Sequence, residues 1–185
     1  MRLAVALTVL GSALGLGGAS PLDRLQPAQH GFGLQDALAF TEFPLFDAGE
    51  RVDGLPLTAV LRRDDTADFV SFVYGDCTAA DDAGCPPPLE IQVWPACLRN
   101  LHLYDSANAE APVPEPTIVR GVPGAFFEDG LRLELQASRS TIVVFGNSRE
   151  RVLRAAGALR EVGTPAPGTR LPAPVPGAVD GALSC

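Results

Sequence analysis

Four cysteines are the residues whose type and spacing bear most directly on chemistry: Cys77, Cys85, Cys97 and Cys185. An even number of cysteines is typical of a disulfide framework in an exported protein, because the space outside the cytoplasm does not keep thiols reduced. Four cysteines allow three pairings, and the short polar loop from Cys77 to Cys85 favours a bond between these two. We therefore predict the disulfide bonds Cys77–Cys85 and Cys97–Cys185.

The spacing of the cysteines argues against metal binding and redox catalysis. Gaps of seven, eleven and eighty-seven residues separate them, whereas structural zinc sites pair their ligands in Cys-x-x-Cys motifs. A thioredoxin-like activity needs the same motif. A four-cysteine zinc site is the alternative to the disulfides, and this spacing disfavours it, so the sequence predicts no metal and no cofactor.

The two histidines offer little for hydrolysis or for transition-metal binding. His30 lies in a segment punctuated by proline and glycine, and His102 alternates with Leu101 and Leu103. This alternation predicts an exposed histidine on the face of a strand. Nucleophilic hydrolysis needs a base within reach of a serine or cysteine, and neither a G-x-S-x-G nor an H-E-x-x-H motif occurs. We therefore predict no catalytic residue.

Aspartates gather in two predicted turns, where they could supply oxygen ligands to calcium. These aspartates are Asp64, Asp65 and Asp68 in the first turn and Asp76, Asp81 and Asp82 in the second. The EF-hand pattern of carboxylates is missing from both, so we interpret them as solvated turn residues, with a weak calcium site as the alternative. A glycosidase could also be built on paired carboxylates, but only their separation in space would define its mechanism.

Three aromatic residues are candidates either for the core or for ligand contact. Trp94 precedes Pro95 and lies between cysteines, a position where an aromatic side chain often packs across a disulfide in the core. Its alternative role is a platform on which a ligand stacks. Phe126 and Phe127 are likewise expected in the core, with a contact at the tip of a loop as the alternative.

The charge balance limits the classes of partner. The chain has 14 basic and 22 acidic residues, a net charge of −8, and every basic residue is arginine. A surface of this sign repels phosphate backbones and anionic lipid headgroups. We therefore expect no nucleic acid partner and no binding to membrane surfaces.

The N-terminus predicts export. Arg2 precedes an apolar run over residues 3–18, and Gly17 and Ala19 form a small-residue site that a signal peptidase accepts. We predict a signal peptide over 1–19, a polar lead-in over 20–41, and a single domain over 42–185 with a proline-rich C-terminal tail. An uncleaved membrane anchor is the alternative for the first segment; in the mature chain we expect no membrane span.

Seven segments have the composition or alternation of strands and are separated by turn residues. They cover residues 42–46, 55–63, 68–75, 89–95, 117–122, 131–137 and 141–145. In the segment 131–137, the leucines at 131, 133 and 135 are expected to face the core, while Arg132, Glu134 and Gln136 face water. The residues 138–140 read as a hairpin connection.

Helical patterns are fewer. A brief helical turn is expected over 34–40, outside the core. The clearest helix begins at Asn147, which can cap the first turn with Glu150 at the reciprocal position, and Gly163 can end it. Strands followed by one amphipathic helix predict an α+β fold, a mostly antiparallel sheet with the helix packed on one face.

Four segments carry a resemblance to other proteins: residues 72–77 (FVYGDC), 84–97 (GCPPPLEIQVWPAC), 141–160 (TIVVFGNSRERVLRAAGALR) and 171–185 (LPAPVPGAVDGALSC). Together they resemble uncharacterised exported proteins of GC-rich actinobacteria. The resemblance implies export and a shared cysteine spacing. It implies no activity or substrate that could be carried to a residue of this chain.

These observations predict a secreted or cell-envelope, noncatalytic domain with a binding or structural role, an unknown protein or cell-envelope partner, and a monomeric state. A small extracytoplasmic hydrolase that uses carboxylates is one alternative. A carrier of an apolar ligand between sheet and helix is another. Two converging carboxylates in a polar cleft would favour the hydrolase, an apolar cavity of several hundred cubic ångströms the carrier, and neither feature the binding domain.

Overall fold

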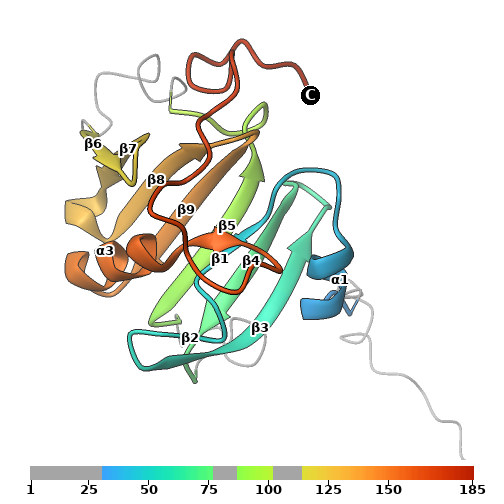
Figure 1. Cartoon of the computed structure of the whole chain (residues 1–185), viewed down its shortest axis with the longest axis vertical. Coiled ribbons are helices and arrows are strands. Elements are labelled where there is room, and N and C mark those ends of the chain that lie inside the picture. The colour runs from blue at the N-terminus through green and yellow to red at the C-terminus, as the bar shows by residue number, and fades with distance from the viewer. Residues whose placement is uncertain (1–30, 77–86, 102–113) are drawn as a thin grey trace, which may run out of the picture.

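A computed structural model describes residues 31–76, 87–101 and 114–185 of the chain (Figure 1). Its helices are α1 (Leu34–Ala39), the 3-10 turn η2 (Glu128–Gly130) and α3 (Arg149–Ala158). Its strands are β1 (Phe46–Asp47), β2 (Arg51–Val52), β3 (Leu55–Arg63), β4 (Phe69–Tyr74), β5 (Leu89–Pro95), β6 (Glu115–Val119), β7 (Val122–Phe127), β8 (Arg132–Ala137), β9 (Ser140–Gly146) and β10 (Arg160–Glu161).

Eight strands form one antiparallel sheet in the order β2-β3-β4-β5-β9-β8-β7-β6. Strands β2 to β5 make one meander and strands β6 to β9 make another, and the two meanders join through their last strands. Strand β5 pairs with β9 over its whole length, from Leu89 opposite Gly146 to Pro95 opposite Ser140. The predicted antiparallel sheet is therefore confirmed. Strands β1 and β10 form a separate two-stranded pair.

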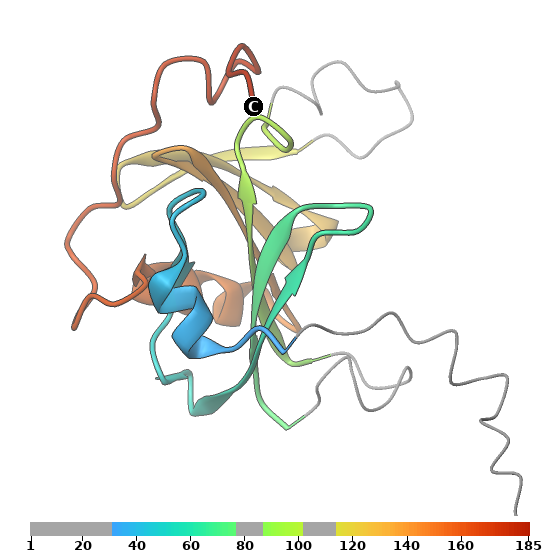
Figure 2. The same cartoon turned by 90° about the vertical axis from the view of Figure 1, so that its right-hand side faces the viewer.

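The hydrophobic core lies against one face of this sheet. On β5, the side chains of Leu89, Ile91 and Val93 all point to this face and are fully buried. The buried side chains of α3, among them Val152 and Ala156, belong to the same hydrophobic cluster. Figures 1 and 2 show α1, α3 and the β1–β10 pair on this side of the sheet.

The opposite face of the sheet carries polar residues, and several of them are buried. Glu134 and Gln136 on β8 are 0% exposed, although alternation predicted that they face water. The prediction was wrong because Glu134 is held by cations: Arg99 Nη2 and Arg132 Nε lie 2.5 and 3.4 Å from its Oε1 atom. A carboxylate can be buried when a paired guanidinium replaces its water.

Two predicted strands differ from the structure. The segment 117–122 is not one strand, because Arg120 and Gly121 have φ angles of 49° and 84° and reverse the chain between β6 and β7. Leu131 lies before β8 and is 41% exposed, so it does not share the buried face of Leu133 and Leu135. The predicted hairpin connection at 138–140 is confirmed, since Ala137 pairs with Ser140.

Helix α3 is shorter than predicted. Ser148, not Asn147, is its N-cap, and the Ser148 side chain accepts a hydrogen bond from the Arg151 amide. The helix ends at Ala158 rather than near Gly163, because Arg160 and Glu161 leave it to pair with Asp47 and Phe46 as β10. Tertiary pairing thus overrides helix propensity in this last turn.

The N-terminal part of the described chain is more central than predicted. Only Phe46 of the predicted strand 42–46 is in a strand. Ala37 of α1 is 3% exposed and belongs to the core cluster, and Phe40 packs against that cluster. The interpretation of residues 34–40 as lying outside the core was therefore wrong.

The C-terminal tail is tied to the body of the protein at its last residue. Cys97 and Cys185 form a disulfide with a Cα–Cα distance of 5.3 Å, as predicted. Backbone hydrogen bonds hold the tail along its way, since the Val175 amide donates to the Ser138 carbonyl and the Ser138 amide donates to the Pro172 carbonyl. The predicted Cys77–Cys85 bond lies outside the described residues.

Candidate binding groove

An ion pair between β1 and β10 lies beside a hollow in the described part of the chain. Strand pairing sets Asp47 opposite Arg160, and Arg160 Nε lies 3.1 Å from Asp47 Oδ1. The same carboxylate oxygen accepts a hydrogen bond from the Gly49 amide at 3.0 Å. Arg160 Nη1 donates to the Pro165 carbonyl at 2.8 Å. These contacts fix the residues after β1 and after β10 against each other.

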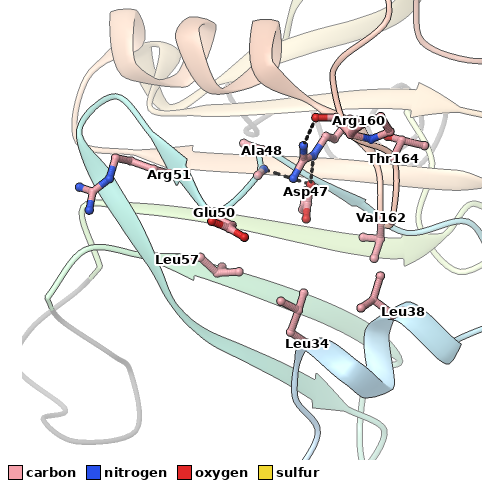
Figure 3. A pocket seen from close by; sticks show the side chains of 13 residues that line it. Leu34, Leu38, Asp47, Ala48, Glu50, Arg51, Leu57, Arg160, Val162 and Thr164 are labelled. Atoms are coloured by element: carbon pink, nitrogen blue, oxygen red, sulfur yellow. Dashed lines mark hydrogen bonds and ion pairs between the residues drawn. The ribbon is translucent and has the colours of Figure 1, made fainter.

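A groove of about 560 Å³ lies beside this ion pair (Figure 3). Helix α1, strand β3 and the segments that follow β1 and β10 form its walls. The residues that line it are Leu34, Leu38, Asp47, Ala48, Gly49, Glu50, Arg51, Leu57, Arg160, Val162, Gly163, Thr164 and Pro165. The groove therefore brings residues between 34 and 57 together with residues 160–165, which are distant in the sequence.

One side of the groove is aliphatic. Leu34 and Leu38 stand four residues apart on α1 and so share a face of the helix. They are 38% and 48% exposed, which is high for leucine. Figure 3 shows Leu38 and Val162 pointing toward each other, with Leu34 on α1 and Leu57 on β3 nearby.

A second hollow of about 220 Å³ extends the groove along α1 toward Phe40 and Leu45. It shares Leu38 and Val162 with the larger hollow. Glu161, which is exposed, lines this extension. The two hollows are thus neighbours between α1 and β10, and we call them together the trough.

The polar side of the groove has one carboxylate that is not held by the protein. Asp47 is nearly buried and is neutralised by Arg160. Arg51 turns away from the groove, and its Nη1 donates to the Gly54 carbonyl at 2.7 Å. Glu50 is exposed, and within the described residues no hydrogen bond or ion pair engages its side chain. The exposed charged groups of the groove are therefore Glu50 and Arg51, one of each sign.

Tyr74 supports the floor of the groove from the sheet. Its phenol oxygen accepts a hydrogen bond from the Ala48 amide at 2.9 Å. Burial raises the pKa of the Tyr74 phenol above its ordinary value, against the lowering effect of this hydrogen bond. Tyr74 is consequently a neutral positioning group that fixes the backbone next to Asp47.

Among the described residues, the hydroxyl and the buried carboxylate of the groove are both engaged by other groups of the protein. The Thr164 hydroxyl lies in the groove but donates to the Glu161 carbonyl at 2.7 Å, and no base engages it. Asp47 is held as a carboxylate acceptor by Arg160 and by the Gly49 amide. In residues 31–76, 87–101 and 114–185, no three acidic, histidine or cysteine side chains gather as a metal site would require.

Of the aspartates singled out in the sequence, those that the structure describes do not line the groove. Asp65 and Asp68 follow β3 and pair with the preceding arginines, Asp65 with Arg63 at 3.8 Å and Asp68 with Arg62 at 3.4 Å. This turn is a charged, solvated connection of the predicted kind. His30, His102, Asp81 and Asp82 lie outside the described residues.

The three aromatic residues predicted to lie in the core differ in their burial. Phe126 and Phe127 are 4% and 5% exposed, which confirms their burial. Trp94 is half-buried on the polar face of the sheet and is outside the core cluster, so that prediction was wrong. Its ring stacks on Phe69 at 4.4 Å, and its Nε1 donates to Gln92 Oε1 at 3.1 Å.

Sequence reasoning found none of the groove residues. Glu50 and Leu38 carry no motif, and they meet only because β10 returns to β1 after α3 ends. The one usable indication was the pair Leu34 and Leu38, which are apolar residues at helical spacing in a segment otherwise predicted to be polar.

Comparison with models of protein families, with curated proteins and with solved structures finds no match to this chain. For membrane insertion, no helix within the described residues is long and apolar enough to cross a bilayer.

Proposed function

We propose that this protein is a noncatalytic α+β domain that acts outside the cytoplasm and binds a partner through the groove between α1 and β10. The observation that carries the proposal is the groove itself. It is a hollow of about 560 Å³ with exposed leucines on one side and an open carboxylate on the other. Exposed aliphatic side chains next to polar groups are typical of interaction sites.

The geometry favours binding over the two alternatives. A hydrolase would need two converging carboxylates of which one acts as acid, whereas Asp47 is occupied by Arg160. A carrier would enclose its ligand in an apolar cavity. The space between α3 and the sheet is filled instead, since Val152, Ala155 and Ala156 are fully buried in the core cluster.

The proposed location has its support in the disulfide. Cys97 and Cys185 are separated by 88 residues, and their bond closes most of the described second half of the chain into one loop. Disulfides of this structural kind persist in oxidising compartments and are rare in the cytosol. The apolar N-terminal run adds a second, sequence-based reason for export.

Site-specific cross-linking tests the proposed function. A photoreactive phenylalanine is placed at Leu38 in the exported protein, and the same residue is placed at Leu153 as a matched control, because Leu153 is a helical leucine of similar exposure on α3. We expect an adduct from position 38 in the extracellular or envelope fraction, none from position 153, and loss of the adduct when Leu34→Ser is added. Equal adducts from both positions, or none from position 38, would refute the groove as the binding site.

A further inference from the structure

Two opposite charges stand next to each other at the larger hollow. Glu50 and Arg51 are consecutive, exposed residues that line the hollow of about 560 Å³. Within the described residues no ion pair engages either side chain, and Arg51 donates one hydrogen bond to the Gly54 carbonyl. The other two charged residues of the lining, Asp47 and Arg160, neutralise each other. A complementary ligand therefore carries one anion and one cation side by side.

Aliphatic side chains make up much of the remaining lining. Leu34 and Leu38 keep 38% and 48% of their surface in solvent, and Leu57 and Val162 are half-buried. Covering such side chains with the apolar groups of a ligand removes them from water and so favours binding. The complementary ligand therefore combines aliphatic side chains with its adjacent anion and cation.

One segment of this chain that lies outside the described residues has this composition. Residues 22–25 read Leu-Asp-Arg-Leu, so that Asp23 and Arg24 are consecutive and stand between two leucines. Elsewhere in the undescribed part of the sequence, arginine occurs only at Arg2. An acidic partner for Arg51 and a basic partner for Glu50 are thus both present within four residues of the same chain.

The connection to α1 keeps this segment close to the hollow. The described part of the chain begins at Gly31, three residues before Leu34, which is the first residue of α1 and part of the lining. A Cβ at Gly31 would meet nothing within 4 Å, so the chain is free to turn at this glycine. The residues from Arg24 to Gly31 span up to about 23 Å when extended. A tether this short gives an effective concentration on the order of millimolar, at which weak contacts are enough for docking.

We propose that residues 22–25 dock in the larger hollow of the same molecule and compete there with the partner. This inference rests on the proposed function and adds a means of regulation to the same site. The leucines of the segment pack on the aliphatic side chains of the lining, Arg24 lies beside Glu50, and Asp23 lies beside Arg51. A partner must displace the segment, so docking lowers the apparent affinity of the site in proportion to the fraction of molecules that remain open.

Photo-cross-linking within the purified full chain tests the docking directly. A photoreactive phenylalanine is placed at Leu38, and the matched control carries it at Leu153, a 44% exposed leucine on α3. An equal mixture of labelled and unlabelled protein distinguishes adducts within one molecule from adducts between two, because the former join peptides of the same isotope. We expect position 38 to form an intramolecular adduct with the peptide that contains residues 22–25, at least about fivefold above position 153.

A charge exchange tests the pairing of Arg24 with Glu50. Arg24→Glu and Glu50→Arg should each lower the yield of this adduct about threefold, because each places like charges next to each other. The two substitutions together should restore the yield to within about twofold of the wild type, since the ion pair is rebuilt with its signs exchanged. The matched controls are Arg139→Glu and Asp64→Arg, charge reversals at exposed turns, and they should leave the yield unchanged. Equal melting temperatures show that the variants are folded.

The competition has its own readout in the adduct that position 38 forms with the partner in the extracellular or envelope fraction. Arg24→Glu leaves the lining of the hollow intact and removes only its internal competitor. This substitution should therefore raise the yield of the partner adduct about threefold, the same factor by which it lowers the intramolecular adduct.

The possible failures are distinguishable. Adducts that join peptides of different isotopes would assign the segment to a second copy of the chain and overturn intramolecular docking. An intramolecular yield that ignores Arg24→Glu, or that the combined substitutions do not restore, would refute the charge pairing. If position 38 captures a partner but never residues 22–25, the inference fails and the proposed function stands. If it captures residues 22–25 but no partner even in Arg24→Glu, docking is supported and the proposed function fails.

Discussion

Removal of the Cys97–Cys185 disulfide is expected to cost this domain a large share of its stability. The double variant Cys97→Ser, Cys185→Ser leaves Cys77 and Cys85 unchanged, so it isolates one bond. Cys185 is exposed and Cys97 is half-buried, and the exchange of sulfur for oxygen therefore removes little packing. The effect comes mainly from the unfolded chain, which gains the freedom that the bond denied it.

The magnitude follows from the length of the closed loop. A separation of 88 residues corresponds to a loss of unfolded-state entropy worth about 4.5 kcal/mol at 25 °C. Small domains have total stabilities of about 5 to 15 kcal/mol, so the variant loses about three tenths or more of this free energy.

Urea unfolding followed by circular dichroism measures the loss. With an m-value of about 2 kcal/mol per molar, the midpoint falls by about 2 M. Hydrogen exchange adds a local readout of the tail. The amide of Val175, a tail residue, donates a hydrogen bond to the Ser138 carbonyl between β8 and β9, and this amide should lose its protection from exchange first. A midpoint that moves by less than 0.5 M would refute the reasoning, since the tail would then be held by its noncovalent contacts alone.

Three further predictions concern packing and charge. Gly124→Ala should destabilise the domain by about 1 to 3 kcal/mol in urea unfolding, because the new Cβ would lie 2.6 Å from the Glu134 carbonyl oxygen. Gly157→Ala on α3 is the control, and it should stabilise the domain by about 1 kcal/mol, because its new Cβ meets nothing within 4 Å. Equal effects of the two substitutions would contradict this account. Leu133→Asp should prevent cooperative thermal unfolding, because it buries an unpaired charge, while Leu131→Asp, at a 41% exposed position, should melt like the wild type. Hydrogen bonds from two arginines of α3 lower the pKa of Asp53 to about 2, so its contribution to stability is complete above pH 4 and is lost as the pH falls from 4 toward 2. Stability measured from pH 6 to pH 2.5 should therefore fall less steeply in Asp53→Asn than in the wild type, and parallel curves would show that these contacts do not stabilise the fold.

The sequence predicted the central strands well because their side-chain pattern is dictated by one buried face. Strand β5 has the bounds that were predicted, 89–95, since its alternate apolar residues Leu89, Ile91 and Val93 all reach the core. The helix pattern of α3 was equally clear. In such elements the local sequence pattern and the tertiary environment favour the same structure, so the pattern alone is enough to predict the element.

Prediction from the sequence failed at positions whose structure depends on residues far away in the chain. Glu134 was placed in water because alternation alone cannot show that Arg99 and Arg132 will lie against it. The turn at Arg120 and Gly121 was missed for a related reason, since the residues around it have strand composition on both sides. A single glycine was the only local indication of the reversal.

The groove could not have been predicted, because it depends on where α3 stops. Residues after Ala158 retain good helix formers, and an isolated helix would continue through them. The chain instead leaves the helix so that Arg160 can pair with Asp47, and the Val162 amide can donate to the Leu45 carbonyl. This exchange of one helical turn for β10 brings Val162 opposite Leu38 and opens the trough next to it.

The same geometry separates the disulfide from the groove. Strand β10 is anchored to β1 by its own ion pair and hydrogen bonds, about twenty residues before the tail reaches Cys185. Breaking the Cys97–Cys185 bond should therefore loosen the tail from its far end and lower the global stability, while the walls of the trough keep their positions in the folded state. The bond sustains the population of the folded domain, and the Asp47–Arg160 pair shapes the surface that we propose as its binding site.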